Sequence, residues 1–202
     1  MFIELTDHLR CPEPHAERFL VLLPGVMGGR RVVGGELGCP VCGKVVVLAD
    51  GIADFGGGTP SAEPGALGAE AIAAFLGLSG PGGWVALIGN ASASAAGLAE
   101  RLPGVRLALV NPPSGTPDSL EASVLRAGRL PLKQGSMRGV VVGTDFGRDP
   151  AWIEDAAGAV LGGLRVVVEG GEPPGGVEVL ARAEGCWVGR KLNAPVRGAP
   201  AG

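Results

Sequence analysis

Short apolar runs broken by glycine or proline dominate the first 55 residues of the chain. Residues 19–23, 31–33 and 44–48 each form such a run, and each is bounded by turn-forming residues. Runs of this length and punctuation predict a small meander of β-strands. A region of this size buries too little apolar surface to be stable alone, so we expect a metal ion or disulfides to support it.

The pattern changes after residues 56–61, where helical stretches begin to alternate with continuous apolar runs. Predicted helices cover residues 66–78, 92–102, 117–127 and 150–161, and predicted strands cover residues 84–88, 107–110, 140–142 and 164–168. Continuous apolar strands between helices indicate a mostly parallel sheet with both faces covered. Residues 177–182 and 186–190, separated by the turn-forming Glu184 and Gly185, predict an antiparallel pair at the end.

The sequence therefore predicts an α/β protein in two parts. A small β-rich domain covers residues 1–56, a linker covers residues 57–65, and a Rossmann-like α/β domain covers residues 66–193. We expect residues 194–202, which consist mainly of Ala, Pro and Gly, to form a disordered tail.

The composition narrows the partners that the protein can have. A net charge of −3 gives no attraction to phosphate backbones or anionic membranes, and the absence of Tyr argues against a stacking surface for single-stranded nucleic acid. No apolar run reaches the ~20 residues needed to cross a bilayer, and the N-terminus lacks the pattern of a secretory signal. We therefore expect a cytoplasmic protein with no membrane partner and no direct binding of nucleic acid.

Clustered cysteines supply the candidate chemistry of the first region, because thiols gathered in a cytoplasmic protein usually bind a metal or react. Cys39 and Cys42 form a C-x-x-C pair followed by Gly43, which can adopt the positive φ that turns backbone amides toward the sulfurs. Two thiolates cannot complete a tetrahedron, so a second pair must come from another turn, and Cys11 and His15 provide it. These four residues predict a closed structural zinc site.

Other interpretations of these residues stay open at this point. His8 can replace His15 as the fourth ligand. The C-x-x-C pair can also be a redox dithiol, although such dithiols open a helix after a strand, whereas a glycine and a predicted strand follow Cys42. Cys186 stands alone, and because no histidine lies beyond residue 15 to activate it, we interpret it as a buried apolar thiol.

The first region resembles a known family in three segments: residues 9–12 (Leu-Arg-Cys-Pro), 38–43 (Gly-Cys-Pro-Val-Cys-Gly) and 49–53 (Ala-Asp-Gly-Ile-Ala). These are similar in order and spacing to the zinc-ribbon proteins that activate tRNA, rRNA and release-factor methyltransferases, which read L-x-C-P…L-x-C-P-x-C…D-G-I-P. The chain departs from that pattern in using Cys11 and His15 in place of a second Cys-x-x-Cys. The resemblance implies action by contact, in which the strands of the ribbon stabilise a partner methyltransferase.

The second region resembles, more distantly, the AdoMet-dependent class I methyltransferase domain, in segments 84–93, 107–112, 130–141 and 164–171. In active members the first segment reads roughly V-L-D-x-G-x-G-x-G, the second ends in Asp or Glu, and the third reads L-P-F-x-D-x-S-F-D. The resemblance implies an AdoMet pocket formed by the glycine loop at Gly89, by Asn111 in place of the ribose carboxylate, and by Gln134 in place of an acid.

Most acidic residues of that pocket are missing. Leu87 stands at the acidic position of the first strand, and Gln134 and Arg138 stand at the two acids of the third segment. A neutral hydrogen bond from Asn111 or Gln134 is weaker than a charge-assisted one. The four replacements are at residues 87, 111, 134 and 138. If each costs about 1 kcal/mol, together they weaken AdoMet binding on the order of a thousandfold. Asp145, which follows the strand predicted at residues 140–142, is a candidate for a remaining catalytic carboxylate.

Two functions fit these residues. The favoured hypothesis is a non-catalytic pseudoenzyme, in which a zinc ribbon and a degenerate methyltransferase fold form an interaction module for a protein partner, either a methyltransferase or a second copy of the chain. The alternative is an active AdoMet-dependent methyltransferase with a fused activator. A nucleic-acid-binding ribbon is disfavoured, since its basic residues are interspersed with acidic ones. The exposed edge strands of a small ribbon are natural pairing surfaces for a protein partner.

Overall fold

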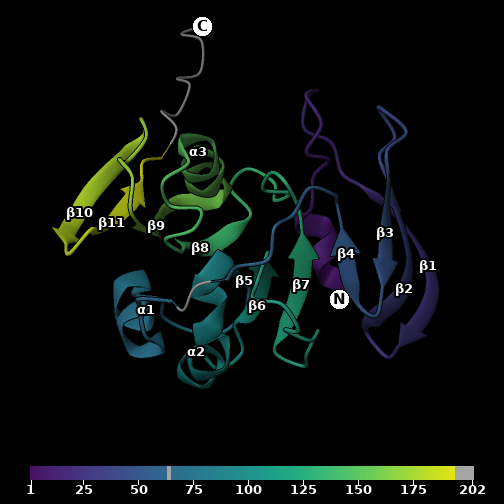
Figure 1. The fold of residues 1–202 in the computed structure, drawn as a ribbon, viewed down its shortest axis with the longest axis horizontal. Helices are drawn as coiled ribbons and strands as arrows, with labels where there is room; N and C mark the ends of the chain where they lie inside the picture. The colour runs from purple at the N-terminus through teal and green to yellow at the C-terminus, as the bar shows by residue number, and fades with distance from the viewer. Residues whose placement is uncertain (63–64, 194–202) are drawn as a thin grey trace, which may run out of the picture.

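One twisted sheet runs through the whole molecule. Across residues 1–62 and 65–193, which the computed structural model describes, eleven strands pair in the order β1-β2-β3-β4-β7-β6-β5-β8-β9-β11-β10. The outermost strands, β1 and β10, lie at opposite ends of the molecule (Figure 1). The predicted α/β class is therefore present, with a mixed sheet whose central strands are parallel.

The N-terminal strands form the expected meander. They are β1 (Val21–Gly28), β2 (Arg31–Gly38), β3 (Val45–Ala49) and β4 (Ile52–Asp54), each antiparallel to the next. A short 3₁₀ helix, η1 (Ile3–His8), precedes them and buries Leu5. The edge strand β1 is irregular, because its register with β2 shifts on both sides of Val26, just after Pro24.

The remaining strands complete the sheet. They are β5 (Trp84–Ile88), β6 (Arg106–Val110), β7 (Ala122–Arg126), β8 (Met137–Val142), β9 (Val160–Glu169), β10 (Val177–Ala183) and β11 (Cys186–Lys191). The predicted C-terminal pair is confirmed: β10 and β11 are antiparallel, with one register shift between Val179 and Ala181. β11 also runs antiparallel to β9, so it is inserted between β9 and β10.

Alternation along the central strands divides the core into two layers. On one face, side chains such as Val85, Leu87 and Val141 pack under α1 (Ala69–Leu76) and α2 (Ala95–Arg101), which follows the 3₁₀ turn η2 (Gly89–Ser94). On the other face, Ala86, Ile88 and Val140 pack under α3 (Pro150–Ala159) and the N-terminal segment with η1. Because both faces are covered, these strands are apolar at nearly every position, which is why the sequence predicted them well.

The helix predicted at residues 117–127 is wrong. Residues Ala122–Arg126 form β7, which pairs with β6 on one side and β4 on the other. Ser123, Val124 and Leu125 are all nearly inaccessible to solvent, so pairing on both sides outweighs local helical propensity. Asp118, expected early in that helix, instead forms ion pairs with Arg31 and with the α-amino group of Met1.

The two predicted regions share one sheet and one apolar layer. β4 pairs in parallel with β7 through Ala53 and Leu125, and buried residues of both regions belong to the same core cluster. The segment around Leu9 forms a bridge to Leu132, and the backbone N–H of Gly128 donates to Gly56 at 2.8 Å. The division into residues 1–56 and 66–193 stays a prediction, and the tail at residues 194–202 lies outside the described residues.

Within the described part of the chain, no helix is both long enough and apolar enough to traverse a lipid bilayer.

Phe2 tests how tightly the N-terminal segment is coupled to the central sheet. The guanidinium groups of Arg106 and Arg31 lie 4.1 and 4.4 Å from the centre of its ring. Its backbone N–H donates to the Ser123 hydroxyl at 2.9 Å, and its ring meets that of Trp84 edge-on. We expect Phe2→Ala to lower the free energy of unfolding by about 2–3 kcal/mol, somewhat less than for a fully buried Phe.

The measurement is urea unfolding followed by the fluorescence of the three tryptophans, all of which lie beyond residue 83. Phe19→Ala is the matched control, because Phe19 is 58% exposed and its loss should change stability by less than about 0.5 kcal/mol. A tryptophan transition unmoved by Phe2→Ala would mean that the N-terminal segment unfolds separately.

Candidate functional site

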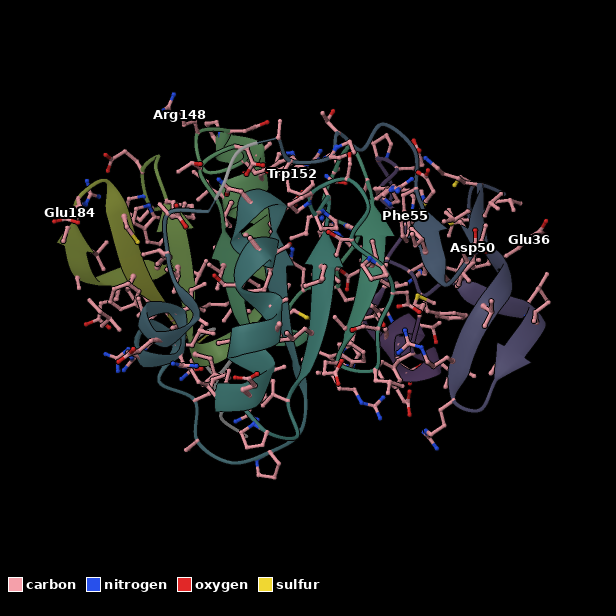
Figure 2. The ribbon with its side chains drawn as sticks, turned by 60° about the horizontal axis from the view of Figure 1, so that its bottom comes forward. Glu36, Asp50, Phe55, Arg148, Trp152 and Glu184 are labelled. Carbon is pink, nitrogen blue, oxygen red and sulfur yellow. The ribbon has the colours of Figure 1, made fainter. Side chains whose placement is uncertain are left out.

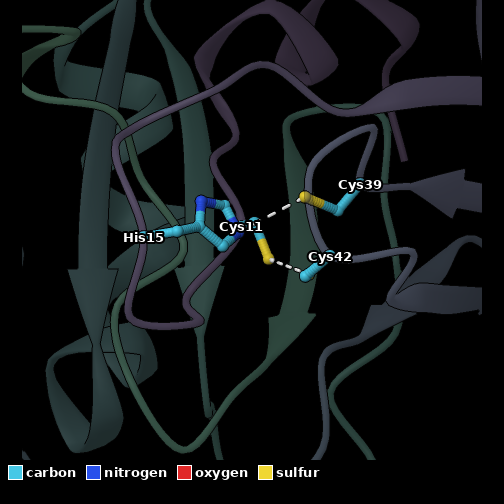
Figure 3. Close-up of side chains that lie close together, drawn as sticks. All are labelled: Cys11, His15, Cys39 and Cys42. Carbon is cyan, nitrogen blue, oxygen red and sulfur yellow. Dashed lines mark hydrogen bonds between the residues drawn. The ribbon is translucent and has the colours of Figure 1, made fainter.

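Two loops of the N-terminal region bring Cys11, His15, Cys39 and Cys42 together. One ligand atom from each residue lies within 4.8 Å of the others, which makes a group able to hold a metal ion (Figure 3). Cys11 and His15 come from the segment after η1, and Cys39 and Cys42 come from the turn between β2 and β3. The spacing that suggested four ligands in the sequence thus corresponds to one cluster in space.

The separations within this cluster suit a tetrahedral ion. The Sγ atoms of Cys11 and Cys42 are 3.7 Å apart, and Cys39 Sγ is 3.4 Å from His15 Nε2. A tetrahedral zinc ion with ordinary bond lengths sets sulfur–sulfur distances of about 3.8 Å and sulfur–nitrogen distances of about 3.6 Å. Three thiols and one imidazole therefore fit zinc, and they leave no open position for a substrate.

The backbone of the Cys39–Cys42 turn favours a thiolate. Gly43 has the expected positive φ of 72°, its N–H donates to Cys39 O at 3.0 Å, and the Cys39 N–H donates to Lys44 O at 2.8 Å. Desolvation raises the pKa of the Cys39 thiol, but hydrogen bonds from the backbone of Cys42 and Val41 outweigh it and bring this pKa down to about 6. A thiol that ionises easily binds a metal ion with less competition from protons.

His15 is oriented by its own backbone neighbour. Its Nδ1 lies 2.9 Å from Ala16 O, so the Nδ1–H tautomer donates there and leaves the Nε2 lone pair facing Cys39. A second hydrogen bond of this kind is what usually fixes a metal-binding imidazole. His8, the other candidate for the fourth ligand, instead stacks obliquely near Trp84 with ring centres 6.1 Å apart, and burial lowers its pKa.

Polar contacts fasten the cluster to the rest of the molecule. Lys44 Nζ lies 2.6 Å from Glu13 Oε1, which joins the two ligand-bearing loops. The guanidinium of Arg10, the residue before Cys11, forms an ion pair with Asp155 of α3 at 2.8 Å. The backbone N–H of Arg10 donates to the carbonyl oxygen of Pro131 at 2.9 Å. Loss of a bound ion would therefore disturb contacts with the α/β part as well as the loops.

The residues predicted to form an AdoMet pocket are not gathered in one place. Gly89 and Asn111 follow β5 and β6, at the carboxyl ends of neighbouring parallel strands. Gln134 precedes β8 and lies against Gly158, at the end of α3 remote from Asp149. Its backbone N–H donates to the Glu17 carboxylate at 2.9 Å, so Gln134 is part of the contact with the N-terminal region.

Asn111 is engaged in a closed pair of hydrogen bonds. Its Nδ2 donates to Ala127 O at 2.8 Å, and its Oδ1 accepts from the Ala127 N–H at 2.9 Å. The side chain is 1% exposed and the backbone has a φ of 51°, a left-handed conformation that Asn tolerates better than most residues. Both polar atoms of the amide are thus used to join the ends of β6 and β7, where a ribose diol would otherwise be held.

The linker lies over this same edge of the sheet. Gly58 approaches Asn111 and the Ala127 amide so closely that a Cβ atom would sit 2.6 Å from each. The Ser61 N–H donates to the Asn111 carbonyl at 3.3 Å. This close contact requires a glycine at position 58. The sequence pattern alone did not reveal that requirement.

Asp145 also turns toward the glycine loop. Its Oδ1 accepts from the Asn90 N–H at 3.3 Å, and its carboxylate and the Phe146 ring leave no space for a side chain at Gly89. An open cavity of about 590 Å³ lies beside it, between the linker and the start of α3. Asp145, Phe146 and Trp152 line this cavity, whereas Gly89, Asn111 and Gln134 do not. Sequence reasoning missed Phe146 and Trp152, although the edge where strand order reverses is the usual place for a ligand.

Comparison with known proteins adds little to this geometry. No protein-family model matches the chain, and no curated protein matches its sequence. A solved structure of a proposed methyltransferase from an antibiotic biosynthesis pathway of Anabaena variabilis ATCC 29413 is similar to 49% of this chain, with 17% identity and a TM-score of 0.37. The match spans 42% of that protein's length. Neither value is high enough to transfer a fold or an activity to this chain.

Zinc content and stability test the metal centre. We expect the wild-type protein to bind one zinc ion per chain, measured by elemental analysis after dialysis. Cys39→Ser and His15→Ala should each lose the ion and melt more than about 10 °C lower, because metal binding is coupled to folding of the loops.

Two controls separate ligands from bystanders. Cys186→Ser and His8→Ala should keep one zinc ion per chain, since neither side chain belongs to the cluster. A zinc content that survives His15→Ala but not His8→Ala would assign the fourth ligand to His8.

Proposed function

We propose that this protein is a zinc-binding, non-catalytic interaction protein, built from a methyltransferase-activator-type ribbon and a degenerate class I methyltransferase fold. The observation that carries the proposal is the Asn111–Ala127 pair of hydrogen bonds with the linker packed on it. One N–H and one oxygen lone pair of this amide are used on the backbone, and burial under Gly58 of the linker keeps the rest of the amide from a ribose.

The strand order supports the methyltransferase-like part of this proposal. The sequence β7-β6-β5-β8-β9-β11-β10, with β11 antiparallel, fits the class I methyltransferase fold that the second region resembles. A fold of this kind can lose its chemistry and keep its shape, since function depends on the site and not on the fold. The missing acids, with Leu87 and Gln134 at two of their positions, point the same way.

An exposed apolar face supports the interaction role. Four apolar side chains lie on the outer face of the ribbon. They are Val21 and Leu23 of β1, 43% and 60% exposed, and Val45 and Val47 of β3, 54% and 57% exposed. The register aligns Leu23 with Val47 across Glu36, and Val21 with Val45 across Gly38. Glu36 lies at the end of the molecule formed by the ribbon strands (Figure 2). Exposed apolar side chains gathered on one sheet face, here around Glu36, are typical of a protein–protein contact.

The proposed partner is a protein, either a methyltransferase or a second copy of the chain. The resemblance of the ribbon to methyltransferase activators supports the first choice. Three thiols that serve as ligands have to stay reduced, so we propose a cytoplasmic location. The second candidate function, an active AdoMet-dependent methyltransferase, is supported by the 590 Å³ cavity and by Asp145 on its wall.

Titration with AdoMet separates the two functions. We expect no measurable heat and no thermal shift with the wild-type protein at millimolar AdoMet, after its zinc content has been confirmed. Asn111→Asp restores the acid of active methyltransferases, yet we expect it to give no binding and to lower stability by about 2 kcal/mol, because the new carboxylate faces the Ala127 carbonyl. Micromolar binding by the wild-type protein, or a gain of affinity in Asn111→Asp, would favour the enzyme.

Charged substitutions on the apolar face test the interaction role. We expect Leu23→Lys combined with Val47→Lys to keep zinc and to change stability by less than about 1 kcal/mol, since both side chains are already exposed and both face Glu36. The same variant should reproduce the cellular phenotype of a gene deletion. Asn111→Ala, assayed at a temperature at which it stays folded, should not. Leu120→Lys is the matched control, because Leu120 is 77% exposed and lies outside this face. A double variant with a normal phenotype would contradict the proposal.

Sedimentation of the wild-type protein at rising concentration tests whether the partner is a second copy of the chain.

A further inference from the structure

A second cavity lies apart from the zinc cluster, between the start of α1 and the hairpin of β10 and β11. Its volume is about 410 Å³, within the range of small-molecule sites. Its lining includes the apolar side chains of Leu67 and Phe75, the thiol of Cys186 and the carboxylate of Glu169. The proposed interaction role uses none of these four residues.

Glu169 is the unusual feature of this cavity. It is the last residue of β9 and is only 4% exposed. No side chain among the residues that the structure describes donates a hydrogen bond to its carboxylate, and the backbone N–H groups of Ala66 and Leu67 are the donors near it. A buried carboxylate with no cation and no side-chain donor is rare, because burial removes its hydration and backbone N–H groups replace it only in part.

The charged groups around Glu169 do not neutralise it. Burial raises the pKa of Glu169; hydrogen bonding to the backbone of Leu67 and Ala66 lowers it in part, and the negative charge of Asp145 raises it further. Arg148 and Glu184 line the cavity at the surface, and both are exposed (Figure 2). These two side chains have opposite charges and leave the rim with no net charge, whereas the interior holds a carboxylate with no cation beside it.

The Cys186 thiol beside Glu169 adds no charge to the interior of the cavity. It lies directly opposite Glu169 in the ladder between β9 and β11, so the two side chains share a face of the sheet. Burial and the Glu169 charge raise the pKa of the Cys186 thiol to about 11. The thiol therefore stays protonated and serves as a neutral, weakly polar wall and not as a nucleophile.

A ligand that completes this site needs a cation and an apolar body. An ammonium group can donate hydrogen bonds to both oxygens of Glu169, and the Phe75 ring can attract the same positive charge. Leu67 and the aliphatic carbons of the wall suit a short hydrocarbon chain. We propose that this cavity binds a small primary alkylammonium ligand, with its ammonium group on Glu169 and its chain against Leu67 and Phe75.

The test uses three probes of equal chain length on the full-length zinc-loaded protein: n-pentylammonium, n-pentanol and n-pentanoate. Backbone amide shifts of Glu169, Gly170 and Cys186 are followed by two-dimensional NMR during each titration. Pentylammonium should give saturable shifts at these amides. Pentanol should bind at least about tenfold more weakly, because it lacks the charge-assisted hydrogen bonds, and pentanoate should not bind.

Two variants with the same loss of charge locate the interaction. Glu169→Gln should weaken pentylammonium binding at least about tenfold, and Glu184→Gln, at the exposed rim, should change it by less than about twofold. Equal weakening by both variants, equal binding of pentanol and pentylammonium, or no shift at the three amides would each overturn the proposal. In the last case the backbone of Ala66 and Leu67, together with water, would satisfy the carboxylate without a ligand.

Stability measurements guard against a merely structural role for Glu169. Its pKa is raised in the folded state, so folding favours the protonated form, and the melting temperature of the wild-type protein relative to that of Glu169→Gln should fall as the pH rises above the usual Glu range. Glu169→Gln should therefore melt higher than the wild type near pH 7. If Glu169→Gln fails to fold, Phe75→Leu keeps the carboxylate and should still weaken pentylammonium binding several-fold through the lost ring.

Discussion

The pairing of β4 with β7 is the constraint on which the rest of the structure depends. β4 is three residues long, yet it is the strand through which the N-terminal meander joins the parallel sheet. Without it β7 would be an open edge, with a row of unpaired backbone groups facing solvent. The short length suffices because contacts of the N-terminal segment assist it: Phe2 and Asp118 hold the start of the chain to β7, and Arg10 holds the ligand-bearing loop to α3.

This arrangement explains why metal binding and the sheet are physically related. Cys11 lies one residue beyond Arg10, and Cys39 lies one residue beyond the end of β2. An ion that joins these loops fixes the register of the meander and the docking of the N-terminal segment at the same time. A β-rich region of about fifty residues has little core of its own, so it gains stability from two sources, the ligand cluster and the shared apolar layer.

Much of the fold could be predicted from the sequence, and the exceptions have physical causes. The central strands were found because burial on both faces makes them apolar throughout, and the ligand cluster was found because C-x-x-C spacing is tied to tetrahedral geometry. β7 was missed because residues 117–121 carry a helix-like pattern, whereas pairing on both sides decides the structure of Ala122–Arg126. The role of Asn111 could not be predicted, since its partner is the backbone of Ala127 and depends on a φ of 51°. Glu169 was not singled out, because a carboxylate at a strand end looks exposed until the packing of α1 is known.

Both outer strands of the sheet carry a defect in their ladder. β1 shifts register beside Pro24, which has no N–H to donate, and β10 shifts between Val179 and Ala181. Ion pairs of Arg182 with Glu172 and of Arg190 with Glu178 add charge at the second edge. An open sheet of this length would otherwise be able to grow end to end into fibrils, strand upon strand, at high concentration. The kinked rims disfavour such growth, which is in keeping with the proposed recognition through a broad face of the sheet.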